Sequence, residues 1–412
     1  MKILELAQFL PPVSGGEERH AWNLSRALAS RGHDVTLLGL ATDGDGSGET
    51  VAEGVRLVRV TSAASRLRFL YSDPSRPHAL PLTDPAVARA ITRELAQGRY
   101  DVVHAHNWIV NSALGPTADA GVPLVMTLHD YSHICATKRL MEFGTQRCPG
   151  PAPMRCLSCS TDLYGRVNGT ATLTANVRSA RRRAAHITYA AAVSSAVAEG
   201  VSIPEHHWLS GTHLRTRVIH NFIPDEIVLD EIPPTLPDAP LLFVGDLSAD
   251  KGVQSLLDAY ARLDSPPTLI LAGRSSENWD FPPGADWVGQ LPHGEVVALF
   301  RSARAVVVPS VWADPCPTVV LEAMAAGRPV VAAASGGILD MVVDGSTGLL
   351  FPPGDVGALA SALTRLLGEP DTAAAFGVAG RDRAREFTIS AIVNKIETMY
   401  GDAIRSSQTA ID

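Results

Sequence analysis

The sequence lacks several features that mark other classes of protein. No apolar run is long enough to span a lipid bilayer, which argues against an integral membrane protein. A basic excess is also missing: 35 lysines and arginines stand against 43 acidic residues, and the net charge of −8 argues against a nucleic-acid-binding protein. The opening residues MKILELAQFLPP are interrupted by Glu5 and ended by two prolines, so we expect a buried strand and no signal peptide. We therefore expect a cytoplasmic protein.

Cysteine is scarce, with five residues in 412. An odd number in a chain without an export signal favours free thiols or a metal site over disulfides. Cys135, Cys148, Cys156 and Cys159 fall in one Pro- and Gly-rich stretch and include a Cys-x-x-Cys pair. Four thiolates match a closed tetrahedral site, so we predict a structural Zn²⁺ there. Two disulfides or idle thiols are about as well supported, and an iron–sulfur cluster is a weaker alternative.

The length of the chain indicates more than one domain. A hydrophobic content of 46% is ample for two cores in 412 residues. The segment PDEIVLDEIPPTLPDAP is rich in acids and prolines, as linkers are. We therefore expect domains at residues 1–225 and 240–389, with the boundary between Asp225 and Pro240.

Strands alternate with helical patterns along the first domain. A strand at 2–8, a Gly-containing loop, a helix at 17–30 and a strand at 34–40 predict the start of a doubly wound parallel sheet. Ligands bind beyond the carboxyl ends of the strands in such sheets. Gly15 and Gly16 in the first loop are therefore candidate contacts, although they could serve only to make a turn.

Histidines follow two later strands of the same domain. His129 stands after the strand VPLVMTL and is the stronger candidate for a catalytic residue, while His104 and His106 in YDVVHAH are weaker ones. A strand-end histidine with a purely structural role is the alternative for each.

A basic cluster follows the cysteine-rich stretch. Arg178, Arg181, Arg182 and Arg183 could face an anionic acceptor or lipid headgroups at a membrane surface. A charge run on a helix is usually solvated, and we favour a solvated face here.

Residues 305–351 carry the sharpest pattern in the chain. Two β-branched runs flank a helical segment that we expect to begin near Pro317 or Thr318 and to stop at Gly327. Asp314 precedes this helix and Glu322 lies within it. After the second run, Ser335, Gly336 and Gly337 open another helix, whose unpaired N–H groups could hold a phosphate or sugar oxygen.

The segments DPCPTVVLEAMAAGRPVV and SGGILDMVVDGSTGLLFPPGD resemble the donor-binding half of the large group-1 (family 4) type of retaining GT-B glycosyltransferases. The resemblance covers nearly the whole chain and is strongest over residues 241–356. It implies an α/β, GT-B fold of two doubly wound, Rossmann-like domains facing a cleft: an acceptor-side domain, with a Cys-rich insertion at 135–159, and a donor-binding domain. A C-terminal helix at 390–412 would pack back on the first domain.

The same resemblance assigns roles to individual residues. Asp314 stands where the family has a Glu that holds the donor sugar, and Glu322 matches the Glu that grips the nucleotide ribose. Lys251 matches a Lys that neutralises the donor diphosphate, and His129 matches a His that touches the donor sugar. The remaining implied donor contacts are Gly15, Gly16, Asn221, Arg274, Cys316, Pro317, Thr318, Gly336 and Gly337.

One residue departs from the family pattern near the expected diphosphate. Asp246 stands where the family usually has Arg, and its charge would repel two phosphates. Arg274 could restore the lost positive charge, or it could form a surface pair with Asp246.

These observations favour a retaining transferase that uses a UDP or GDP sugar and a hydroxyl acceptor whose identity stays open. We expect no catalytic cofactor or metal, because Lys251 and helix N-termini would stabilise the departing diphosphate, and Asp43 and Asp45 lie in a Gly-rich loop without a fitting context. A donor-binding partner subunit that has lost transfer activity is the alternative. A phosphorylase is less favoured, since nothing in the sequence demands pyridoxal phosphate.

Overall fold

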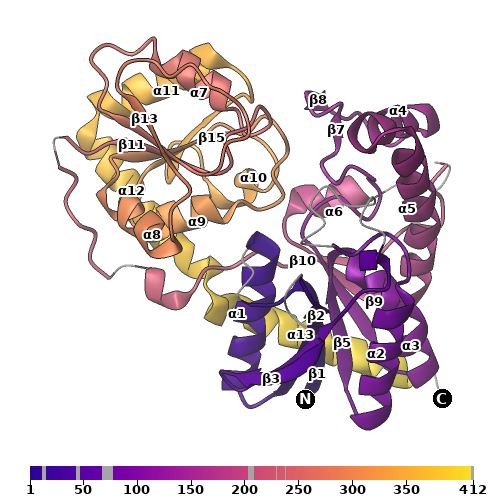
Figure 1. Cartoon of the computed structure of the whole chain (residues 1–412). Helices are drawn as coiled ribbons and strands as arrows, with labels where there is room; N and C mark the ends of the chain where they lie inside the picture. The colour runs from indigo at the N-terminus through magenta and orange to yellow at the C-terminus, as the bar shows by residue number, and fades with distance from the viewer. Residues whose placement is uncertain are drawn as a thin grey trace. The chain divides into compact units, whose positions relative to one another are not determined.

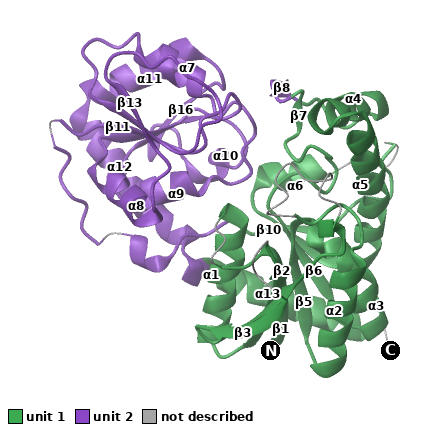
Figure 2. Ribbon diagram, viewed as in Figure 1, with its two compact units in different colours: residues 1–143, 148–220, 392–412 green, residues 144–147, 221–391 purple. Residues whose placement is uncertain are grey.

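The computed structural model describes residues 1–11, 15–42, 47–66, 78–202, 208–228, 230–236 and 238–409. The chain forms two compact units (Figure 2). Unit 1 contains residues 1–143, 148–220 and 392–412, and unit 2 contains residues 144–147 and 221–391. Apart from residues 144–147, unit 2 begins at Asn221, ahead of the linker that we expected between Asp225 and Pro240. Asp43 and Asp45 lie outside the described residues.

Unit 1 is built on an eight-stranded sheet with the order β10-β9-β6-β5-β1-β2-β4-β3 (Figure 1). Its strands are β1 (Lys2–Phe9), β2 (Asp34–Leu40), β3 (Gly48–Ala52), β4 (Val55–Val60), β5 (Val102–His106), β6 (Leu124–Leu128), β9 (Ile187–Ala192) and β10 (Thr216–Val218). All pair in parallel except β3, which runs antiparallel to β4. Strand order reverses between β1 and β5, where doubly wound sheets bind their ligands.

Helices connect the strands of unit 1. Asp84 caps α2 by accepting hydrogen bonds from two backbone N–H groups, and Pro85 occupies the first helical position. The helices are α1 (Gly16–Ser30), α2 (Pro85–Gln97), α3 (Leu114–Ala120), α4 (Pro153–Tyr164), α5 (Arg166–His186), α6 (Ser195–Val201) and the 3₁₀ turns η1 (Ala64–Arg66) and η3 (Asn107–Ser112). The last helix, α13 (Ile389–Thr409), belongs to unit 1 from Ile392 onward.

Unit 2 is built on a six-stranded, wholly parallel sheet with the order β13-β12-β11-β14-β15-β16. Its strands are β11 (Leu241–Val244), β12 (Leu269–Ala272), β13 (Ala285–Gly289), β14 (Ala305–Val308), β15 (Val330–Ala333) and β16 (Gly348–Phe351). Several of these strands are buried throughout, as is typical of parallel sheets covered on both faces. The order reverses between β11 and β14, which places the expected ligand site there. The predicted α/β class is confirmed.

The helices of unit 2 follow the sequence pattern closely. Helix α9 begins at Thr318 with Pro317 as its cap residue, and Gly327 follows its end in the left-handed region with a φ of 67°. The helices are α7 (Val253–Tyr260), α8 (His293–Ser302), α9 (Thr318–Ala325), α10 (Ile338–Met341), α11 (Val356–Gly368), α12 (Pro370–Ala384) and the 3₁₀ turns η4 (Asp225–Ile227) and η5 (Arg385–Phe387).

The Cys-rich insertion is more regular than we expected. It carries two short strands, β7 (Met141–Glu142) and β8 (Gln146–Arg147), and its last part is the first half of helix α4. Cys156 and Cys159 lie on this helix. No helix in the described part of the molecule is both long and apolar enough to cross a membrane.

Candidate active site

An ion pair lies at the point in unit 2 where the strand order reverses. Lys251 follows β11, Asp314 follows β14, and Lys251 Nζ donates a hydrogen bond to Asp314 Oδ2 over 2.5 Å. The side chain of Asp314 is 8% exposed, and Lys251 Nζ also lies 5.2 Å from the centre of the Trp312 ring. An ammonium group has three N–H donors, so Lys251 can bind a further anion while it holds Asp314.

The loop after β14 is packed tightly against the Gly336 turn. Gly336 has a φ of 58°, and a Cβ atom there would lie 2.2 Å from the carbonyl oxygen of Asp314, so only glycine fits. The N–H of Gly337 donates to that same carbonyl over 2.8 Å. We expected the Gly337 N–H to be unpaired and able to bind a phosphate. In this structure it is instead hydrogen-bonded to the Asp314 loop, which corrects that expectation. Helix α10 has only four residues, so its dipole is weak as well.

Among the described residues of unit 2, three buried side-chain polar atoms have no hydrogen-bond partner, and one of them is Arg328 Nε. The other two are the indole Nε1 of Trp312 and the side-chain oxygen of Asn221. The Nδ2 group of Asn221 donates to the carbonyl of Cys316 over 3.1 Å. Burial raises the pKa of the Cys316 thiol to about 12, so this thiol stays neutral. Unpaired buried polar atoms are costly, and a bound ligand would relieve that cost.

Glu322, Pro317 and Thr318 belong to the start of the helix that follows Asp314. Pro317 is the cap residue, Thr318 the first residue, and Glu322 lies one turn further on and is partly buried. The structure thus places Asp314 in the loop before α9 and Glu322 within α9, as the sequence predicts. Their roles toward a donor stay a proposal.

Arg274 forms a two-point ion pair with Asp246. Its Nε donates to Asp246 Oδ1 over 3.1 Å and its Nη2 donates to Oδ2 over 2.9 Å. Both side chains are more than half exposed. The structure therefore shows the second of our two alternatives, and the pair balances the negative charge of Asp246.

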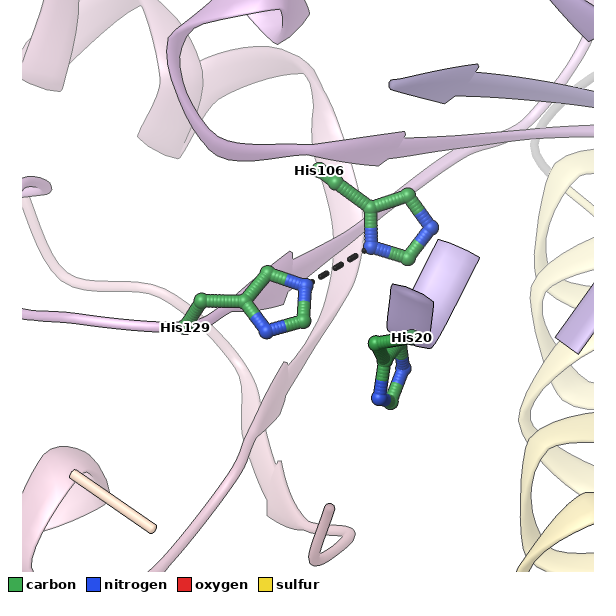
Figure 3. A group of neighbouring side chains, drawn as sticks. All are labelled: His20, His106 and His129. Carbon is green, nitrogen blue, oxygen red and sulfur yellow. Dashed lines mark hydrogen bonds between the residues drawn. The ribbon is translucent and has the colours of Figure 1, made fainter. Parts of the chain in front are cut away.

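In unit 1, three histidines gather where the strand order reverses (Figure 3). His20 lies on α1, His106 ends β5, and His129 follows β6. His106 Nδ1 lies 2.9 Å from His129 Nε2, and the two rings are stacked with centres 5.1 Å apart. The His20 ring meets the His129 ring edge-on at 4.8 Å. Burial, followed by the neighbouring His charges, holds the pKa of His20 and His129 well below the usual range, so both are neutral at pH 7.

A buried carboxylate extends this cluster. Glu5 on β1 is fully buried and accepts a hydrogen bond from His106 Nε2 over 3.0 Å and another from the Tyr400 hydroxyl over 2.7 Å. His104 Nδ1 lies 2.7 Å from the Tyr400 oxygen. Burial alone would raise the pKa of Glu5, but His104 and His106 outweigh it and hold that pKa well below its usual range.

Two overlapping groups in unit 1 have ligand atoms close enough to hold a metal ion. They are His20, His106 and His129, and Glu5, His104 and His106; the atoms of each group lie within 4.8 Å of one another. Hydrogen bonds join Glu5, His106 and His129 directly, so a hydrogen-bonded network accounts for these contacts without a metal.

Gly15 and Gly16 open α1 beside this cluster. Gly15 is the cap residue with an extended backbone, and a Cβ on Gly16 would meet no atom of the described residues within 4 Å. Glu17 in the first turn accepts a hydrogen bond from Asn107 Nδ2 over 2.7 Å. Burial and the neighbouring Glu18 raise the pKa of Glu17 to about 8. Gly16 therefore lies next to carboxyl groups, which suit a polar neutral ligand better than a phosphate.

The four cysteines of the insertion lie near one another but are more widely spaced than the ligands of a bound metal ion. All four are free thiols, and burial raises the pKa of Cys148, Cys156 and Cys159. Within the described ranges, no three of their sulfurs lie within 4.8 Å of one another. The neighbouring Cys135 contributes to the raised pKa of each of the other three thiols, so the four lie in one neighbourhood, and the zinc site stays a prediction.

Arg183 corrects our expectation of a solvated basic face on α5. Its side chain is fully buried and donates to Asn111 Oδ1, Asn176 Oδ1 and the carbonyl of His133 over 2.8–3.0 Å. Burial lowers its pKa to about 9, which still leaves it charged at pH 7. Arg178, Arg181 and Arg182 are not buried.

Sequence reasoning missed Glu5 and Tyr400 altogether and gave little weight to His106. Glu5 did carry a signal, because a charged residue in the middle of an otherwise apolar strand needs a buried partner. Tyr400 carried none, since its contact with Glu5 joins residues 395 positions apart.

Comparison with known proteins identifies the class. Residues 14–226 match Glycosyltransferase Family 4, and residues 232–383 match Glycosyl transferases group 1. The chain belongs to this family of glycosyltransferases.

Individual relatives agree over nearly the full length. Glycogen synthase from Mycobacterium tuberculosis is 31% identical over 93% of this chain and 90% of its own length. Sucrose-phosphate synthase from Thermosynechococcus elongatus superposes with a TM-score of 0.72 at 20% identity, covering 98% of this chain and 99% of that one. HepE from Anabaena, solved in complex with UDP, gives 0.66 at 19% identity over 98% of this chain and all of that one. These neighbours define the fold as GT-B.

Proposed function

We propose that this protein is a retaining glycosyltransferase that moves a sugar from a UDP or GDP sugar to a hydroxyl acceptor. The observation that carries the proposal is the Lys251–Asp314 pair at the switch point of unit 2, followed directly by Glu322 on α9. Complexes of HepE with UDP support a UDP donor, and the glycogen synthase relative supports a sugar acceptor.

The chemistry needs a cation for the leaving group and acceptors for the sugar hydroxyls. As the bond between the anomeric carbon and the phosphate oxygen breaks, its electron pair moves to the diphosphate, and Lys251 stabilises that growing charge. The acceptor oxygen then attacks from the same face while its proton passes to the departing phosphate. Asp314 would hold a sugar hydroxyl and Glu322 the ribose. For His129 the resemblance implies a contact with the donor sugar, and we keep that role as part of the proposal.

The unpaired polar atoms of Trp312 and Asn221 support a ligand at the switch point of unit 2. The Trp312 indole N–H could donate a hydrogen bond to a phosphate oxygen, and the Asn221 side-chain oxygen could accept one from a hydroxyl group. Asp246 does not argue for a loss of transfer activity, because Arg274 balances its charge.

Mass spectrometry of the purified protein with a panel of sugar nucleotides tests the proposal. A UDP or GDP sugar should bind and release free nucleotide when a hydroxyl acceptor is added. Binding without release from any donor would instead support the partner-subunit alternative. A protein that binds no sugar nucleotide would contradict both.

A further inference from the structure

The histidine cluster of unit 1 contains a hydrogen-bonded chain whose direction can be worked out. It begins at Glu5, passes through His106 and ends at His129, with distances of 3.0 and 2.9 Å. Glu5 lies on β1, His106 ends β5 and His129 follows β6, and these three strands are neighbours in the sheet. The hydrogen-bonded chain therefore runs across three strands to His129, which is partly exposed. Figure 3 shows its last contact, between His106 and His129.

The proton positions follow from counting donors and acceptors. An ionised carboxylate can only accept, so His106 must carry its proton on Nε2 to bond Glu5. A neutral His106 then has a lone pair on Nδ1, and the 2.9 Å contact requires His129 to donate from Nε2. A neutral His129 with its proton on Nε2 must present a lone pair on Nδ1, the nitrogen that does not face His106 (Figure 3).

Packing makes this arrangement hard to reverse. Glu5 and His106 are fully buried, and the Tyr400 hydroxyl holds the second oxygen of Glu5 over 2.7 Å. Rotating either side chain would leave a buried charge or ring nitrogen without its hydrogen bond, which is energetically costly. The direction of the chain is thus set by the carboxylate at its buried end.

We propose that Glu5, acting through His106, is a positioning residue that fixes the Nε2–H form of His129, so that His129 Nδ1 accepts a hydrogen bond from a hydroxyl of the sugar being transferred. This inference rests on the proposed function for its substrate, while the proton position of His129 can be measured without it. A structural role for Glu5 alone would predict lower stability and no change at His129.

The first arm of the test is a nitrogen-15 NMR spectrum of histidine-labelled protein. The His129 signals are those that disappear in His129→Asn. In the wild type, Nε2 should carry the proton and Nδ1 should not. In Glu5→Gln, whose amide can donate to His106 and reverse the chain, His129 should shift at least in part to the Nδ1–H form.

The second arm measures transfer. Glu5→Gln should lower kcat/KM by about 10- to 100-fold, while the affinity for free UDP or GDP, which lacks the sugar, should stay within about twofold. Glu94→Gln is the matched control: it removes another buried carboxylate of unit 1, one that binds Arg56 and Tyr100, and it should leave both kcat/KM and the His129 proton position unchanged.

If Glu5→Gln does not fold, His106→Phe keeps a ring at that site, removes both nitrogens and should leave His129 as a mixture of the two forms. A wild-type His129 with its proton on Nδ1 would overturn the proposal, and so would a folded Glu5→Gln with unchanged proton position and unchanged transfer. Tight Zn²⁺ binding that is lost in His20→Asn would also overturn it, because a metal would then occupy these nitrogens. Absence of transfer in the wild type would count against the proposed function, and the NMR arm would still decide the inference.

Discussion

At the residue scale, the two carboxylates of unit 2 have distinct surroundings. Asp314 is buried and paired with Lys251, whereas Glu322 sits within α9 and is partly buried. In the proposed function, Asp314 serves the sugar and Glu322 the nucleotide. Each carboxylate should therefore affect a different ligand.

Glu322→Ala should weaken the binding of free UDP or GDP. The carboxylate is proposed to accept hydrogen bonds from two ribose hydroxyls, and their loss should cost about 1.5–3 kcal/mol, roughly 10- to 150-fold in Kd. Isothermal titration measures this directly. Glu295→Ala, on the exposed face of α8, is the control and should bind as the wild type does. An unchanged Kd together with a lower melting temperature in Glu322→Ala would show that Glu322 only stabilises its helix.

At the element scale, the sequence was informative wherever local patterns decide structure. Helix α9 begins at Thr318 and ends before Gly327 because Pro and Gly act through their own backbones. Helix α4 was missed because its Pro, Ser and Cys content is typical of loops, and its packing against α5 stabilises it instead. Long-range contacts override such local preferences.

The burial of Arg183 could have been predicted from the sequence of helix α5. Its buried face includes Leu173, Asn176, Ala180 and Arg183, which are spaced by three or four residues. Arg183 lies on this face, so the helical spacing of the buried residues predicts that it is buried too. The run of arginines suggested instead that it is solvated.

Arg183→Lys should lower the free energy of unfolding by about 2–4 kcal/mol. A lysine has one nitrogen and cannot reach the amide oxygens of Asn111 and Asn176 and the His133 carbonyl together, so buried acceptors lose their donors. Urea unfolding measures the loss. Arg182→Lys, on the exposed side of the same helix, should change stability by less than about 0.5 kcal/mol. Equal effects of the two substitutions would contradict the buried network.

The Cys-rich insertion offers a second test at this scale. The zinc prediction requires Cys135, Cys148, Cys156 and Cys159 to come closer together than they do here. If zinc binds, protein purified without chelator should contain about one Zn per chain, and Cys156→Ser should lose it and loosen the insertion. Metal-free protein with four titratable thiols and full stability would rule the site out.

At the scale of the whole molecule, both units place polar residues where their strand order reverses. That part of the account was predictable, because alternating strands and helices fix the topology and hence the ends of the strands. The partners of each polar residue were not predictable. Gly337 bonding the Asp314 loop and Tyr400 bonding Glu5 both depend on packing between distant segments.

The molecule should lose stability in mild acid. Burial lowers the pKa of His133 to about 3 and that of His78 to about 4, and it also lowers the pKa of His20, His106 and His129. Since unfolded histidine binds protons below about pH 6.5, stability should fall from pH 6.5 toward pH 4, by about 2 kcal/mol at pH 5 for His133 and about the same for His78.

Glu17 acts in the opposite direction, because its raised pKa of about 8 adds stability as the pH falls toward 4.5. Five histidines should outweigh one carboxyl group. Urea unfolding at pH 6.5 and 5 measures the sum, and His133→Asn should show a shallower slope against pH than the wild type. Stability that rises on acidification would contradict the neutral state of these histidines.

The central claim is that Lys251 stabilises a departing nucleotide diphosphate without a metal ion. The most direct measurement is transfer from a UDP or GDP sugar in EDTA, with the product's anomeric configuration read by proton NMR, for the wild type, Lys251→Met and the exposed control Lys395→Met. We predict transfer with retained configuration for the wild type and the control, and a loss of at least about 100-fold in kcat/KM for Lys251→Met. Transfer that requires added Mg²⁺ or Mn²⁺, or that persists in Lys251→Met, would contradict the account.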